Sequence, residues 1–310
     1  MRNILYGYEE EFNLLSSIYN NGKLPNKILF SGKKGIGKSL TANHFVNYIL
    51  SKNEEHCYDL NNKIILNNNK SFKLVENRSH PNFFNIFKKE DKKFIEISQI
   101  RELNNFVNKS SFNDFLKIIL IEDVEYLTTN ASNSLLKLVE EPNNNVQFIL
   151  IHDNSKFILD TLKSRCIEFK FTLEDKFIPL IVDKIFEQQV FCNINEDFKY
   201  NYLTPHNYFN LINFCNKENI SINDATINVV LSKIINKSLY KFNRINIDEL
   251  KLYLEIFFKK LYIKKKNKKF LEYANFYNQK FYRSIKYNLD LESFFIEFNN
   301  EFLLWKLTMI

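Results

Sequence analysis

Apolar residues in the first half of the chain form two kinds of pattern. Three nearly unbroken apolar runs have the length of buried strands: residues 27–30, 116–121 and 146–151. Three further segments repeat their apolar residues every three or four positions, as helices do: residues 39–50, 97–107 and 131–141. Because strands that alternate with helices are typical of parallel sheets, this half predicts a doubly wound α/β fold.

The strand pattern fades after about Phe171, and helical patterns replace it. One helical face carries Leu250, Tyr253, Leu254, Phe257, Phe258 and Leu261. Another carries Leu291, Phe294, Phe295, Phe298, Phe302 and Trp305. Aromatic stripes of this kind are typical of a helical core or of a subunit interface, so we expect the second half to be helical.

Composition and charge narrow the class of protein without naming a function. The 310 residues predict about two domains, and 45% hydrophobic residues with 25% charged residues exclude bulk disorder. Lys and Arg outnumber Asp and Glu by 43 to 36, and this net charge of +7 does not by itself indicate nucleic-acid binding. No apolar run reaches the ~18 residues of a membrane span, and the N-terminus lacks the apolar segment of a signal peptide. We therefore expect a cytoplasmic protein that does not contact a membrane.

The four cysteines do not indicate a disulfide framework or a metal site. They are Cys57, Cys166, Cys192 and Cys215. None belongs to a Cys-x-x-Cys pair, and the expected cytoplasmic setting disfavours disulfides. We expect no zinc.

The segment Gly32-Lys33-Lys34-Gly35-Ile36-Gly37-Lys38-Ser39 fits the phosphate-loop pattern, between a short strand and a helix. In such a loop, glycines let backbone N–H groups converge on phosphate oxygens. The lysine would reach the β- and γ-phosphates, and the serine hydroxyl would bind Mg²⁺. The residues expected to hold ATP with Mg²⁺ are Gly32, Gly35, Ile36, Gly37, Lys38, Ser39 and Leu40. A chance glycine turn is the alternative, but the strand–loop–helix context favours nucleotide binding.

A second acidic motif completes the predicted nucleotide site. Glu122 and Asp123 directly follow the apolar run 116–121, where a Walker-B-like pair must lie. The first acid would hold Mg²⁺ together with Ser39, and the second would reach the attacking water. The alternative is a pair of acids at an exposed strand end.

These motifs belong to a longer set that resembles a clamp-loader AAA+ module. The specific elements are Leu-Leu-Lys-x-x-Glu-Glu-Pro at 135–142 and Ser-Arg-Cys at 164–166. Further matching segments lie at 24–30, 80–82, 97–103, 121–128 and 148–150. Together they resemble the delta-prime subunits of bacterial DNA polymerase III over about residues 6–171; beyond that, only size and helical character agree.

The resemblance implies a subunit of an ATP-dependent assembly that loads a sliding clamp onto primed DNA. Its partners would be the gamma/tau and delta subunits, the sliding clamp and, through the complex, DNA. The arginine of Ser-Arg-Cys, Arg165, would be a trans-acting arginine finger in the neighbour's ATP site; a surface or helix-capping arginine is the alternative. The family also implies three parts: an AAA+ domain at 1–171, a helical lid at 172–222, and a C-terminal helical collar for oligomerisation at 223–310.

One departure from the family pattern bears on catalysis. The usual Asp-Glu order is inverted to Glu122-Asp123, which argues against hydrolysis at this chain's own site. The polar residue that the family places after the strand 146–151 is either His152 or Asp153.

The alternative functions for this chain are a hydrolysing motor subunit (gamma/tau-like), an unrelated P-loop ATPase or kinase, and an autonomous DNA-binding protein. A polymerase site is not expected in this chain.

Overall fold

The computed structural model describes residues 3–89, 92–109, 116–140, 145–199, 201–241 and 245–304. The chain divides into two compact units, residues 1–181 and 182–310. The predicted boundaries at 171 and 222 remain a prediction, and each unit is described here by itself.

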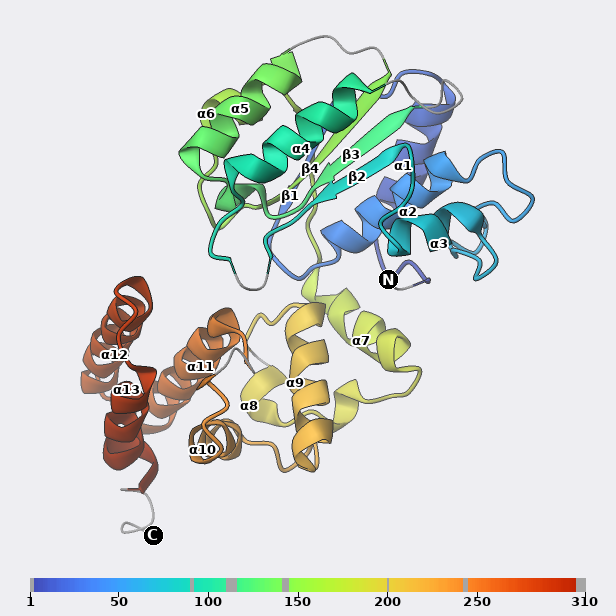
Figure 1. Ribbon diagram of the computed structural model, residues 1–310. Helices are drawn as coiled ribbons and strands as arrows, with labels where there is room; N and C mark the ends of the chain where they lie inside the picture. Colours follow the sequence, from blue (N-terminus) through green and yellow to red (C-terminus); the bar gives the residue numbers. More distant parts are fainter. Residues whose placement is uncertain are drawn as a thin grey trace. The chain divides into compact units, whose positions relative to one another are not determined.

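The first unit is built on a five-stranded parallel sheet (Figure 1). The strands are β1 (Lys27–Gly32), β2 (Phe83–Ile86), β3 (Lys117–Ile121), β4 (Val146–Asp153) and β5 (Ile167–Lys170). Their order across the sheet is β2-β3-β4-β1-β5. The predicted doubly wound α/β fold is therefore confirmed. The apolar runs predicted the three central strands but neither edge strand, because an edge strand is only partly buried and its hydrophobic pattern is weaker.

Helices cover both faces of this sheet (Figure 1). One face packs against α1 (Glu9–Asn20), α2 (Lys38–Leu50) and α3 (Lys70–Glu76). The other packs against α4 (Ile97–Asn108), α5 (Thr129–Glu140) and α6 (Asp160–Lys163). Side chains alternate between the faces: Ile118 and Leu120 of β3 join the α2 side, whereas Ile119 and Ile121 join the α4 side.

Helix α3 lies in a segment where the apolar pattern of the sequence predicted no helix. The Asn69 side chain accepts a hydrogen bond from the Phe72 N–H at 2.6 Å and starts the helix. Phe72 is buried against the α2 side of the sheet. One capping residue and one anchoring ring thus specify a helix too short for periodicity to reveal. Glu141 and Pro142, expected at the end of α5, lie outside the described residues.

The second unit is helical throughout its described part. It contains the end of α7 (Ile178–Phe186), then α8 (Glu196–Lys199), α9 (Pro205–Glu218), α10 (Ile227–Asn236), α11 (Ile247–Lys265), α12 (Lys269–Lys286) and α13 (Leu291–Phe298). A π-helix, Asn299–Leu304, follows. The stripe predicted on 250–261 is fully buried, and Phe294, Phe295 and Phe298 of the second stripe are buried with it. Trp305 lies outside the described residues.

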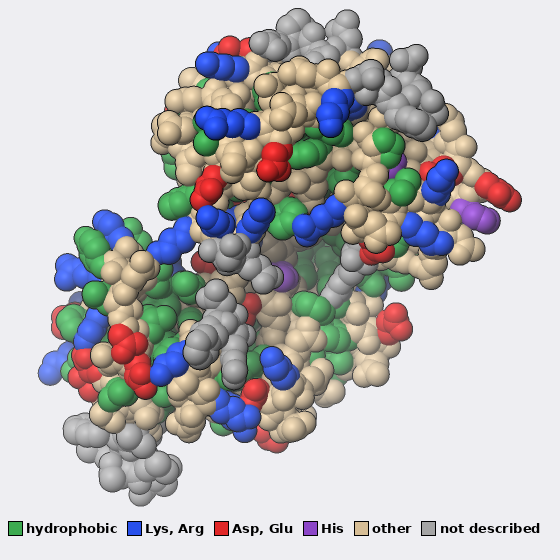
Figure 2. Space-filling view, viewed as in Figure 1, with side chains coloured by type: hydrophobic (Ala, Val, Ile, Leu, Met, Phe, Trp, Pro, Cys, Tyr) green, Lys and Arg blue, Asp and Glu red, His purple; other side chains and the backbone are tan. Residues whose placement is uncertain are grey.

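Surface chemistry agrees with the mild net charge. Figure 2 shows Lys and Arg side chains scattered over the visible face and interspersed with Asp and Glu. The C-terminal helices expose several large apolar side chains; those of α12 are Leu271, Tyr273, Phe276 and Tyr282. Among the described helices, none is long and apolar enough to cross a membrane.

Candidate nucleotide-binding site

The predicted phosphate loop connects the end of β1 to the start of α2. Gly35 has φ +83° and Gly37 has φ +115°. Residues other than glycine rarely adopt such backbone angles. Gly37 is the N-cap of α2, so the loop leads directly into a helix of 13 residues. The first N–H groups of a helix have no partner within it, and its dipole favours negative charge there. The backbone of this loop is therefore arranged to receive an anion.

Lys38 is buried beside the loop. Its Nζ donates hydrogen bonds to the carbonyl oxygens of Gly32 and Lys33, each at 2.7 Å. Burial lowers the pKa of Lys38 to about 8, although Asp153, Glu125 and Asp123 oppose this shift. The ammonium group is thus held at the loop by carbonyl oxygens and surrounded by carboxylates.

The strand alternation directs Glu122 toward the loop. Glu122 follows Ile121 and returns to the α2 side of the sheet, where it hydrogen bonds with the Ser39 hydroxyl. Burial raises the pKa of this carboxyl group, and the two hydrogen bonds, from Ser39 and from Asn85 Nδ2 at 3.3 Å, act against that rise. The structure therefore brings together Ser39 and Glu122, the two residues predicted to hold Mg²⁺. Hydroxyl and carboxylate oxygens together with phosphate oxygens are the donors that Mg²⁺ prefers, so these residues fit the metal.

Asp123 leaves the strand direction. Its φ of +55° is in the left-handed region, and it begins a 3₁₀ turn at Val124–Tyr126. The two adjacent acids therefore have different backbone settings. Only Glu122 retains the geometry of the strand end.

Glu125 is a site residue that the sequence reasoning missed. Its Oε2 accepts a hydrogen bond from the Asp153 N–H at 3.2 Å, and its Oε1 is buried without a hydrogen-bond partner among the described residues. Burial, with Asp123 and Asp153 nearby, raises its pKa. Three acids within 122–125 were visible in the sequence, but only the first two matched the expected motif.

The structure distinguishes between His152 and Asp153 by face. Asp153 pairs in register with Gly32 at the loop and acts electrostatically on Lys38. His152 belongs to the other side of the strand, and its Nε2 lies 2.8 Å from the Lys156 carbonyl oxygen. Asp153 is therefore the residue of the two that adjoins the phosphate loop.

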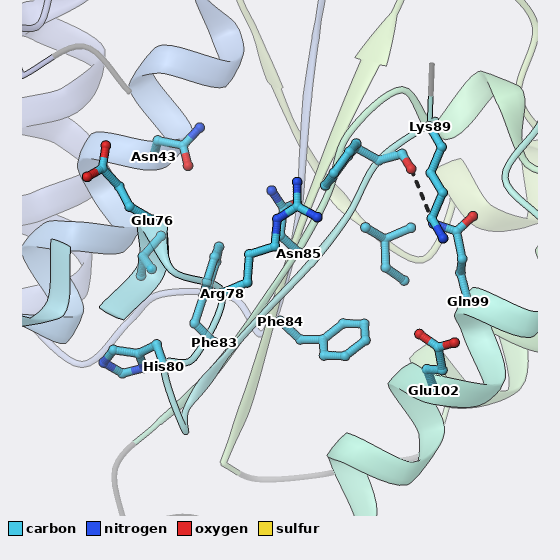
Figure 3. A pocket seen from close by; sticks show the side chains of 13 residues that line it. Asn43, Glu76, Arg78, His80, Phe83, Phe84, Asn85, Lys89, Gln99 and Glu102 are labelled. Carbon is cyan, nitrogen blue, oxygen red and sulfur yellow. Dashed lines mark hydrogen bonds between the residues drawn. The ribbon is translucent and has the colours of Figure 1, made fainter. Parts of the chain in front are cut away.

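A cavity of about 530 Å³ lies along the outer edge of β2 (Figure 3), and one of the residues that line it, Asn85, hydrogen bonds with Glu122. Asn85 lines the cavity while its amide reaches Glu122, and its Oδ1 is buried without a partner among the described residues. The Arg78 guanidinium lies 5.0 Å from the centre of the Phe87 ring within the same wall. Sequence reasoning did not identify Asn85, because β2 carries no apolar run.

Arg165 lies far from the loop of its own chain. It precedes β5, and the parallel pairing of Ile28 with Ile167 places the start of β5 beside the start of β1. The loop follows the other end of β1, roughly 15–20 Å away at the rise of a strand. Arg165 Nη1 donates to the Thr161 carbonyl oxygen at 2.8 Å, and Nη2 lies 2.6 Å from Glu140 Oε1.

The sheet order, the phosphate loop and the acidic residue Glu122 directly after β3 define a P-loop protein of the AAA+ class. A solved structure with the same fold is the DNA polymerase III gamma subunit-related protein from Thermotoga maritima, with a TM-score of 0.51 and 14% identity over 91% of this chain and 96% of that one. At the sequence level, the family described as "DNA polymerase III, delta subunit" matches residues 7–175. The chain belongs to this family, as its motifs predicted.

Individual relatives agree with this assignment. The chain is 32% identical over 182 residues to DNA polymerase III subunit delta' of Bacillus subtilis, which is 57% of this chain and 50% of the relative. It is 30% identical over 158 residues to the delta' subunit of Pseudomonas aeruginosa, covering 50% and 45%. The chain thus spans about half the length of the curated relatives it matches. The similarity is concentrated in the unit that carries the phosphate loop.

Proposed function

We propose that this chain is a delta-prime-type subunit of a bacterial clamp loader. It would bind ATP at its own phosphate loop and donate Arg165 to the ATP site of a neighbouring subunit. Family membership and the placement of Arg165 near the start of β1 and β5, at the opposite end of these strands from the chain's own loop, support this proposal.

Nucleotide binding would use the loop and the start of α2. Lys38 would exchange the carbonyl oxygens of Gly32 and Lys33 for phosphate oxygens. Ser39 and Glu122 would hold Mg²⁺, which supplies positive charge against the phosphate oxygens. The other loop residues would contribute backbone N–H groups.

Hydrolysis at this chain's own site would be weak. Glu122 is engaged with Ser39, so polarising an attacking water would fall to Asp123. The aspartate side chain is one carbon shorter than the usual glutamate, and its left-handed backbone directs it away from the strand line. The pair would therefore support binding better than turnover.

The neighbouring subunit would receive Arg165. A guanidinium group at a γ-phosphate offsets the charge that develops as the phosphoryl group is transferred. Because Arg165 cannot serve its own loop without crossing the length of the sheet, a role in another subunit is the one its position supports.

Assembly would involve the gamma/tau and delta subunits, with the sliding clamp and primed DNA engaged by the complex in the cytoplasm. The predicted collar, residues 223–310, would supply a subunit interface. The large apolar side chains that α12 exposes support this proposal, because apolar and aromatic residues are enriched in interface cores.

Steady-state ATP turnover of the chain alone, and after adding gamma/tau and delta, tests the proposal. We expect little turnover by the chain alone, and DNA- and clamp-stimulated turnover in the complex. Arg165→Ala should reduce the stimulated turnover by about 10³-fold or more per affected site while leaving ATP binding to this chain unchanged.

Two outcomes would contradict the proposal. Unchanged turnover and clamp loading with Arg165→Ala would exclude the trans-acting role. Rapid turnover by the chain alone, lost in Lys38→Ala, would instead establish a hydrolysing motor subunit.

A further inference from the structure

Arg165 is held by two contacts within its own unit. Nη1 donates to the carbonyl oxygen of Thr161 in α6, and Nη2 pairs with the carboxylate of Glu140, the last residue of α5. The side chains of Arg165 and Glu140 are 37% and 51% exposed, so the pair lies where another molecule can reach it. Thr161 orients the guanidinium group, and Glu140 neutralises its charge.

The two contacts have different consequences for an incoming phosphate. A backbone carbonyl uses one of the five N–H donors of arginine and leaves its full charge in place. The Glu140 carboxylate, 2.6 Å from Nη2, is negatively charged as a phosphate is, and it accepts from the guanidinium N–H groups that a phosphate would use. An exposed ion pair is worth little, so a triphosphate can displace the carboxylate at a small cost.

We propose that Glu140 competes within the chain with the neighbour's phosphate for Arg165. Before the ATP site of the neighbour is occupied, Glu140 pairs with the finger; ATP engagement requires that pair to open. Glu140 is thus a positioning residue: it sets the concentration of ATP at which Arg165 binds the phosphate in the neighbour's site. This inference rests on the proposed trans-acting role of Arg165.

Removing the negative charge of Glu140 tests the competition. In the complex assembled with full-length subunits, Glu140→Gln should raise kcat/KM for ATP by about 1.4- to 5-fold, the range expected from one exposed ion pair. The gain should shrink as salt is raised from low to ~0.5 M, because exposed charges are screened. Damage to the fold would lower kcat/KM and could not produce this salt-sensitive gain.

Matched variants keep the test specific. Glu174→Gln removes the carboxylate of another exposed pair at 2.6 Å, Lys176–Glu174 in the same unit, and should leave kcat/KM unchanged. In an Arg165→Ala background, Glu140→Gln should produce no gain.

The outcomes separate the two proposals. If Arg165→Ala is defective and Glu140→Gln gives an unchanged or lower kcat/KM, the proposed competition by Glu140 is wrong, whereas the trans-acting role of Arg165 is retained. A gain from Glu140→Gln that persists in the Arg165→Ala background also overturns it. If Arg165→Ala is fully active, the trans-acting role fails, and the competition fails with it.

Discussion

Lys38 combines two opposing environments at a single residue. Burial favours its neutral form, whereas the carboxylates of Asp123, Glu125 and Asp153 favour its charged form. Burial prevails, and the pKa of about 8 is low for a lysine. The charge that a phosphate needs is therefore lost within an accessible pH range.

We predict that the affinity for ATP falls as the pH rises above about 8. The free protein loses the Lys38 proton through that range, and phosphate binding requires its return, so affinity should fall by up to about tenfold per pH unit. Titration calorimetry with Mg-ATP at pH 7.5, 8.5 and 9.5 measures this, since the phosphates are already ionised there. Lys38→Arg keeps its charge throughout and should show a flat profile at lower affinity. Equal pH dependence in both proteins would contradict the assignment.

Cysteine reactivity is also decided residue by residue. Cys166 and Cys215 are buried, and burial raises the pKa of each thiol to about 11. Cys57 and Cys192 are exposed. Because the thiolate is the reactive form, the two buried cysteines are protected and act as small core residues.

At the scale of elements, a lysine in the apolar run of β3 stabilises the end of a helix. Lys117 is buried, and its Nζ donates to the carbonyl oxygens of Phe106 at 2.9 Å and Val107 at 3.1 Å, and also to that of Lys109. These carbonyls belong to the last turn of α4 and the residue after it, where helical partners are missing. Lys117, the first residue of β3, thus links this strand to the end of α4.

We predict that Lys117→Met destabilises the protein by about 1–3 kcal/mol, because buried carbonyl groups lose a charged donor without gaining water. The change should lower the urea midpoint of unfolding. Lys109→Met, at an exposed position that immediately follows α4, is the control and should shift it little. An unchanged midpoint for Lys117→Met would show that the capping bonds add no net stability.

At the scale of the whole molecule, the chain consists of two compact units with separate cores. The first is the sheet with its helices, and the second contains an aromatic cluster of α11, α12, α13 and the π-helix. Phe298 is fully buried in that cluster and packs against Phe257, Phe258 and Tyr277 at ring-centre distances of 5.1, 6.0 and 5.7 Å. No residue of the proposed nucleotide site belongs to this second core.

We predict that Phe298→Ala costs about 3–5 kcal/mol in the second unit and leaves ATP binding in the first unit unchanged. Hydrogen exchange should accelerate in α11–α13 but not in β1, β3 and β4. Tyr282→Ala, at a side chain that is 63% exposed, should leave exchange in both units unaltered. If exchange accelerated equally in both units, the two cores would not be independent.

Residues close together in the chain specified the central strands, the phosphate loop, the acid-ended strand and the motifs of the family. Each depends on short-range spacing: a buried strand needs an unbroken apolar run, and a phosphate loop needs glycines followed by lysine and serine. The resemblance therefore identified the family from residues 6–171 before any packing was known, and the family match over 7–175 confirms it.

Tertiary structure decided the features that depend on pairing between distant segments. The parallel register placed Asp153 rather than His152 at the loop, and Arg165 at the opposite end of the strands. It also brought Asn85 to Glu122. Packing of α5 against α6 brought Glu140 to Arg165. The spacing of residues along the chain defines on which face of an element a side chain lies. Only the strand order and register define which residues of other elements it contacts there.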